Sequence, residues 1–314
     1  MKRSARTRCG APGVIAAAVL ALLLSACSDG SDEPPAESSP SPAGPVLAVK
    51  IDNAPQARPQ TGLNAADVVY VEQVEAGLSR LMALYATRLP GSVGPVRSAR
   101  ESDLELLAQF PEPTLVFSGA QSKLLPLIAD APLRPVTPGD APAGAFTRDP
   151  ARTAPYNLYV RPPRVQNRPA GAVALERAGF REGPAPGGGE RVNERTVRLP
   201  SARFTFTWSA GRGRWLIAMD GRPAAEPDGT PVTAATVIVQ RVEIRESRFR
   251  DFMGNNTPLT VTVGSGSAEV LRGGQAHRGE WKRPSAESGT SFTTPDGDPL
   301  NIADGPVWVM LVSR

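Results

Sequence analysis

The N-terminal segment constrains this chain most, because it separates a short export-type leader from the part that can fold. Residues 1–13 contain four basic and no acidic residues, and the 11-residue apolar run Val14–Leu24 follows them. A helix that crosses a bilayer needs about 20 apolar residues, so this run is too short to be a permanent anchor. The layout is typical of a secretory signal, and the folded body is therefore expected to lie after it.

The signal ends in Leu24-Ser25-Ala26-Cys27, which resembles the cleavage box of bacterial lipoproteins. In such proteins the cysteine thiol receives a diacylglyceryl group and becomes the new N-terminus. The alternative is a chance cysteine beside an ordinary cleavage site. The box predicts a signal peptide over 1–26 and lipidation at Cys27. Because two acyl chains hold a protein stably on a membrane, we also predict an extracytoplasmic location on the cell membrane.

Composition excludes several kinds of chemistry. Cys9 lies in the signal, so the folded body has no thiol for a disulfide, a nucleophile or a metal ligand. His277 is the only histidine, and the glycines around it predict an exposed loop. Zinc-hydrolase spacings are absent, and we expect neither a metal nor a cofactor. From Val46 onward the chain has 31 basic and 27 acidic residues, a charge too mild to predict nucleic-acid binding.

Shifts in composition predict the organisation of the chain. Residues 27–45 are Ser, Pro and acidic residues and indicate a disordered tether. Residues 46–180 mix strand-like and helical patterns, and 181–200 contain a Pro/Gly-rich linker. In 201–314, short alternating runs such as Phe204-Thr205-Phe206-Thr207-Trp208 predict strands. The predicted fold class is α+β or α/β, with an N-terminal mixed α/β domain followed by a smaller β-rich, largely antiparallel domain.

The sharpest polar motif is Gly-Pro-Val-Arg-Ser-Ala-Arg at 94–100. A helical pattern over 98–109 with Ser98 as its N-cap would place Arg97 and Arg100 beside the helix N-terminus. Cations are unfavourable there unless an anion neutralises them. Either Glu101, Asp103 or a carboxylate from another segment pairs with them in a structural network, or the site binds phosphate or carboxylate.

Two further polar groups flank the first strands. Asp52 and Asn53 follow one strand, and Arg58 comes soon after them. Glu72 and Glu75 lie at an odd spacing in the next strand-like run, so they would point to opposite faces and could not act as a carboxylate pair.

These segments together resemble the YerB-like lipoprotein family, over essentially residues 46–314. The resemblance implies two conserved domains of unknown function. Relatives carry His where this chain has Tyr156, which weakens any proposal of histidine-based catalysis. The resemblance rests on Val49-Lys50-Ile51-Asp52-Asn53, Arg58-Pro59-Gln60-Thr61-Gly62-Leu63, Ala66-Asp67-Val68-Val69-Tyr70, Glu75-Ala76-Gly77, the motif at 94–100, Asn157-Leu158-Tyr159 and Gly279-Glu280-Trp281.

The resemblance favours one shared pocket over unrelated ion pairs. We expect binding of a cell-envelope component, such as an anionic or sugar-containing wall fragment, or of a wall-assembly partner protein. The alternatives are a wall-acting hydrolase or transferase that uses carboxylate and arginine chemistry, and a structural envelope protein with no small ligand. The predicted pocket consists of Asp52, Asn53, Arg58, Glu75, Arg80, Arg97, Ser98, Arg100, Asn157 and Tyr159.

Overall fold

A computed structural model of the chain describes residues 44–251 and 253–314. The predicted signal peptide, the lipidation site Cys27 and nearly all of the predicted tether lie outside the described residues. In the described part, no helix combines the length and the apolar character that a membrane span requires.

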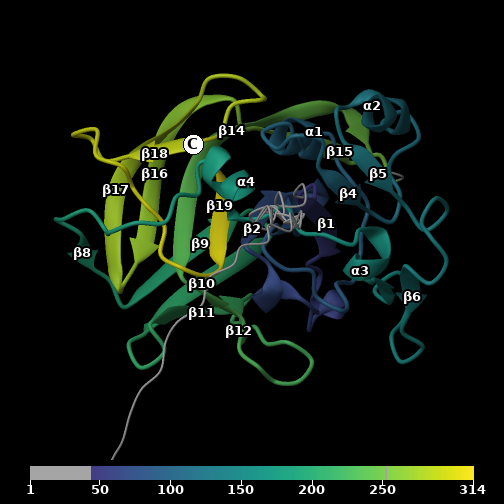
Figure 1. The fold of residues 1–314 in the computed structure, drawn as a ribbon, viewed down its shortest axis with the longest axis horizontal. Helices are drawn as coiled ribbons and strands as arrows, with labels where there is room; N and C mark the ends of the chain where they lie inside the picture. Colours follow the sequence, from purple (N-terminus) through teal and green to yellow (C-terminus); the bar gives the residue numbers. More distant parts are fainter. Residues whose placement is uncertain (1–43, 252) are drawn as a thin grey trace, which may run out of the picture. The chain divides into compact units, whose positions relative to one another are not determined.

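A large mixed sheet runs through the described chain, in the order β18-β17-β16-β14-β19-β2-β3-β1-β4-β5. Figure 1 shows this order from the yellow-green strands on the left to β4 and β5 on the right. The strands are β1 (Leu47–Asp52), β2 (Val68–Gln73), β3 (Ser79–Tyr85), β4 (Thr114–Val116), β5 (Arg134–Val136), β14 (Thr236–Arg250), β16 (Gly264–Arg272), β17 (Gln275–Arg283), β18 (Ser291–Thr293) and β19 (Val307–Ser313), with β15 (Asn256–Val261) paired to β14 and β8 (Glu190–Arg191) paired to β17.

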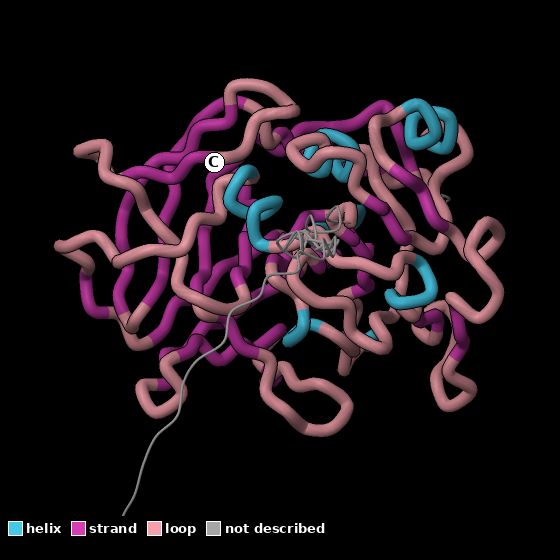
Figure 2. The backbone as a smooth tube through the Cα atoms, in the orientation of Figure 1, coloured by secondary structure: helices cyan, strands magenta, loops and turns pink. Residues whose placement is uncertain are grey.

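A second, antiparallel sheet and a few short helices complete the fold (Figure 2). The second sheet contains β9 (Glu194–Leu199), β10 (Ala202–Ser209), β11 (Arg214–Met219), β12 (Arg222–Pro223) and β13 (Thr233–Ala234), and a separate ribbon contains β6 (Phe146–Arg148) and β7 (Leu158–Val160). The helices are α1 (Ser102–Leu107), α2 (Leu125–Asp130), α3 (Pro162–Val165) and α4 (Ala172–Arg177), with single 3₁₀ turns η1 (Pro55–Ala57), η2 (Leu63–Ala65) and η3 (Glu75–Gly77).

The core lies on both faces of the large sheet, as β19 illustrates. Its alternate residues enter two different apolar clusters, because successive side chains of a strand point to opposite faces. On one face Trp308 packs against Phe204 and Phe206 of β10, with ring centroids 6.4 and 6.5 Å apart. On the other face Val307 and Val309 join a cluster that includes residues of α1 and α4. Side chains of β19 therefore pack the large sheet against the second sheet.

The predicted fold class is confirmed. The first half supplies a mixed sheet with short helices, and the second half is mostly antiparallel strand. One predicted helix is much shorter than expected, since residues 98–101 are extended or turn and α1 begins at Ser102. The expected loop position of His277 is wrong. His277 is a buried residue of β17, paired with Val270, because the turn ends at Gly274 and not after it.

The division into domains at 181–200 stays a prediction. Strands from both halves share the large sheet, because β19 pairs in parallel with β2 from Val307 opposite Val68 to Met310 opposite Val71.

Candidate functional site

Eight of the ten predicted pocket residues line one cavity of about 470 Å³. We call it the arginine cavity. Its wall comes from the end of β1, the start of β3, the segment before α1, and the turns that follow β11 and β14. The residues used below are Asp52, Asn53, Arg58, Glu75, Leu78, Arg80, Arg97, Ser98, Arg100, Tyr156, Asp220, Asp251 and Met253.

The ends of neighbouring strands bring the first charges together. β1 and β3 are antiparallel, and their register places Asp52 opposite Arg80. The strand β2 ends at Gln73, so Glu75 lies in the 3₁₀ turn η3 and not in the strand. This turn directs Glu75 to Arg100, a pairing that a continuous strand through residue 75 would not give.

Arg100 donates four of its five N–H groups to protein partners. Its Nε and Nη2 donate to the two carboxylate oxygens of Glu75, at 2.6 and 2.9 Å, and Nη1 donates to the carbonyls of Ser98 and Ala99. Burial alone would raise the pKa of Glu75, but the hydrogen bonds and charge of Arg100, with a hydrogen bond from Thr257, lower it to about 2. This pair is therefore a fixed structural ion pair.

Arg58 likewise donates four of its five N–H groups. Its three side-chain nitrogens donate to Asn53, to the carbonyl of Met219 and to the carboxylate of Asp220. Asn53 in turn receives a hydrogen bond from Gln60 and donates one to Ser79. Arg58 thus joins the end of β1 to the turn after β11 with four of its five N–H donors, and one Nη1 N–H remains.

Arg97 forms one ion pair and keeps most of its hydrogen-bond donors unpaired within the described chain. Its Nε lies 2.8 Å from Asp52 Oδ2 in an ion pair without hydrogen-bond alignment, and its guanidinium carbon lies 5.9 Å from the centre of the Tyr156 ring. The other carboxylate oxygen of Asp52 accepts from the backbone N–H of Ala54. Within the described chain, Nη1 and Nη2 of Arg97 donate to no residue, and its side chain is 26% exposed.

Arg80 is the arginine of the cavity without a carboxylate partner among the described residues. Its single hydrogen bond runs from Nη1 to the carbonyl of Ser98, at 3.2 Å. Burial, followed by the charge of Arg100, lowers the pKa of Arg80 to about 10, although Glu75 and Asp52 oppose this shift. Arg80 therefore stays protonated at neutral pH, and its Nε and Nη2 are available.

The structure corrects the predicted role of Ser98. Ser98 does not cap α1, because the residue before that helix is Glu101 and the carboxylate of Asp103 accepts from the backbone N–H of Arg100. The backbone carbonyl of Ser98 instead accepts from Arg80 and Arg100. The hypothesis of an anion site at a helix N-terminus led by Ser98 is therefore wrong, and the arginines meet in a cavity formed by strand ends.

Asn157 and Tyr159 do not line the arginine cavity. Asn157 accepts a hydrogen bond from Arg148, and the hydroxyl of Tyr159 accepts one from Arg152. Tyr159 lines a neighbouring groove, which Arg58 also borders.

Sequence reasoning missed a buried charge cluster beside the cavity. The Nζ of Lys50 donates to Glu72 at 2.7 Å and to Asp103 at 2.6 Å, and all three side chains are at most 1% exposed. The cluster supports the cavity, since Asp103 accepts from the N–H of Arg100 and the carbonyl of Lys50 accepts from the N–H of Arg97. A lysine within the apolar strand Leu47–Asp52 was the available signal.

Glu72 makes folding stability depend on pH. Burial raises its pKa to about 7, Lys50 opposes this shift and Asp103 adds to it. In the unfolded chain the Glu72 carboxyl group loses its proton near pH 4.5, whereas in the folded chain it keeps the proton up to about pH 7. The free energy of unfolding therefore falls as pH rises from about 4.5 to 7. Urea titrations should show this fall, by about 1 kcal/mol or more, in the parent protein relative to Glu72→Gln. Parallel profiles for the two proteins would contradict the shift.

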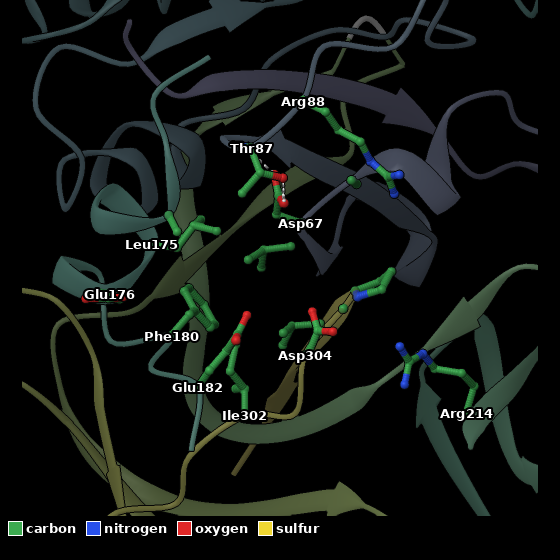
Figure 3. Close-up of a pocket in the computed structure, with 16 residues that line it drawn as sticks. Asp67, Thr87, Arg88, Leu175, Glu176, Phe180, Glu182, Arg214, Ile302 and Asp304 are labelled. Carbon is green, nitrogen blue, oxygen red and sulfur yellow. Dashed lines mark hydrogen bonds between the residues drawn. The ribbon is translucent and has the colours of Figure 1, made fainter. Parts of the chain in front are cut away.

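Another cavity, of about 450 Å³, lies near α4 and is shown in Figure 3. The carboxylates of Glu182 and Asp304 face its open middle, while Asp67 accepts hydrogen bonds from the N–H groups of Ala86 and Thr87. The described residues contain no group of three or more ligands that could hold a metal ion.

Comparison with known proteins places the chain in a family. Residues 31–175 match the N-terminal domain, and 195–309 the C-terminal domain, of the protein of unknown function DUF3048. The chain belongs to the DUF3048 family. The YerB protein of Bacillus subtilis, known from a crystal structure, has the same fold as this DUF3048 protein, with a TM-score of 0.69 at 20% identity over 87% of this chain and 92% of that one.

The sequence of a Bacillus subtilis protein named "Putative lipoprotein YerB" is 47% identical to this DUF3048 protein over 55 residues. That match spans 18% of this chain and 17% of the relative. The predicted resemblance to YerB-like proteins is confirmed, and the family itself assigns no reaction.

Proposed function

We propose that this DUF3048 protein is a membrane-anchored envelope lipoprotein that binds an anionic envelope component in the arginine cavity. The lipid anchor at Cys27 is supported by the sequence of the signal and by the name of the relative. An extracytoplasmic location follows from export and lipidation of this kind.

One observation carries the binding proposal. The cavity contains four carboxylates, and each accepts hydrogen bonds or an ion pair from the protein: Asp52, Glu75, Asp220 and Asp251. Most of the unused hydrogen-bonding capacity of the charged groups lies in the donors of Arg80 and Arg97, since Arg58 and Arg100 each retain a single N–H. Two guanidinium groups with free N–H donors in a concave site form a receptor for a carboxylate or phosphate group.

Replacing both free arginines tests the proposal. Arg80→Gln with Arg97→Gln should weaken the binding of acetate or phosphate about tenfold or more, because each charge-assisted hydrogen bond contributes on the order of 1.5 to 3 kcal/mol. Isothermal titration calorimetry measures this loss. Arg80 has no carboxylate partner in the described chain, whereas Arg97 pairs with the buried carboxylate of Asp52, so the melting temperature is measured beside binding, and Arg80→Gln alone is the variant that breaks no ion pair.

Two control variants sharpen the test. Arg212→Gln changes an exposed turn arginine and should leave anion binding unchanged. Arg100→Ala strands the buried carboxylate of Glu75 and should lower the melting temperature. If neither anion binds to the parent protein, or if the Arg80 and Arg97 substitutions leave binding unchanged, the proposal fails and a purely structural network stands.

A wall-acting hydrolase or transferase of the kind considered above would use Glu75 as its carboxylate, with Arg97 and Arg100 stabilising charge. With a pKa of about 2, Glu75 does not donate a proton near neutral pH, and both of its carboxylate oxygens already accept hydrogen bonds from Arg100, so neither is free to act as a nucleophile or base. Binding is therefore the function that the geometry favours. Incubation with labelled wall fragments separates the two, because a binding protein leaves their mass unchanged and an enzyme does not.

A further inference from the structure

Two exposed apolar side chains lie at the rim of the arginine cavity. Among the described residues, four large apolar side chains are strongly exposed: Leu78, Leu125, Val173 and Met253. Leu78, at 43%, and Met253, at 73%, both line the arginine cavity, beside the ring of Tyr156. Exposed apolar groups gathered at a concave site indicate a ligand that covers them, and a small inorganic anion would not do so.

The charge of the cavity limits the charge of its ligand. Four arginines and four carboxylates line it, so its formal net charge is zero. The carboxylates are Asp52, Glu75, Asp220 and Asp251. The cost of removing an ion from water rises steeply with its charge, and a cavity with no net positive charge does not offset this cost for a dianion. A monoanion fits this charge balance better than a phosphate dianion does.

We propose, resting on the proposed function, that the ligand is a carboxylate monoanion joined to an apolar group, as at the C-terminus of a peptide that ends in an apolar residue. Its carboxylate accepts from the free donors of Arg80 and Arg97. Its apolar side chain lies against Leu78 and Met253 at the rim. A cavity of about 470 Å³ is in the size range of sites for small ligands.

Matched peptides test this ligand class on the chain from residue 44 onward and on the full chain. N-acetyl-Ala-Leu should bind about tenfold more tightly than N-acetyl-Ala-Gly, because it buries an additional leucine side chain. The amide N-acetyl-Ala-Leu-NH₂ lacks the carboxylate and should bind at least about tenfold more weakly. Phosphate should bind more weakly than N-acetyl-Ala-Leu.

Variants of Leu78 and Met253 test whether these two side chains cause the preference for the leucine peptide. Leu78→Ser with Met253→Ser should bring the affinity for N-acetyl-Ala-Leu down to that for N-acetyl-Ala-Gly, without changing the affinity for acetate. Both side chains are exposed, so folding should survive, and circular dichroism verifies this. Val173→Ser changes an equally exposed side chain that does not line the cavity and should have no effect.

The outcomes separate this inference from the proposed function. Equal affinities for the leucine and glycine peptides, or tighter binding of phosphate, would overturn the ligand class while acetate binding through Arg80 and Arg97 still stood. If acetate, phosphate and the peptides all fail to bind, both proposals fall together.

Discussion

Replacing Lys50 with methionine is expected to lower the free energy of unfolding by about 3 to 5 kcal/mol. Lys50 is fully buried and is the cation that neutralises Glu72 and Asp103 in this cluster, at 2.7 and 2.6 Å. Methionine has a similar shape without the charge, so the substitution leaves two buried carboxylates close together without a counterion. Urea denaturation at pH 7 measures the loss.

Two further variants show whether the loss of stability comes from the burial of the charges or from breaking any ion pair. Arg195→Met breaks the ion pair with Glu269, whose side chains are 35% and 26% exposed, and should cost at most about 1 kcal/mol. The triple variant Lys50→Met, Glu72→Gln, Asp103→Asn removes all three charges and should recover part of the stability lost in Lys50→Met. Equal effects of Lys50→Met and Arg195→Met would contradict the buried cluster.

Cys27→Ser is expected to abolish stable membrane attachment. The chain would then be released or would remain as a precursor with its signal uncut, because serine cannot receive the lipid through a thioether. The apolar run Val14–Leu24 is too short to replace the lipid as a permanent anchor. Membrane fractionation with mass spectrometry of the N-terminus measures both location and processing.

Cys9→Ser is the matched control for this prediction. It changes the other cysteine of the chain, within the segment that cleavage removes, and should leave anchoring unchanged. A Cys27→Ser protein that stays on the membrane with its signal removed would show that lipidation at Cys27 is not what attaches it.

Local patterns in the sequence determined most of the strands and the general composition of the site. Alternating apolar residues located β10, and the strand-like runs that precede Asp52 and contain Glu72 located β1 and β2, because the side-chain period of a strand is visible over a few residues. The family resemblance grouped the polar motifs into one pocket, and eight of those ten residues line the arginine cavity.

The tertiary structure alone decided which of those residues have hydrogen-bond donors available for a ligand. Arg80, Arg97 and Arg100 have equal charge in the sequence, yet Arg100 forms a two-bond ion pair with Glu75, 25 residues away, and Arg80 has no such partner among the described residues. The burial of Lys50 likewise depends on partners 22 and 53 residues distant. Such pairings follow from strand order and long-range register, as in the parallel pairing of β2 with β19, and periodicity within one segment contains no information about either.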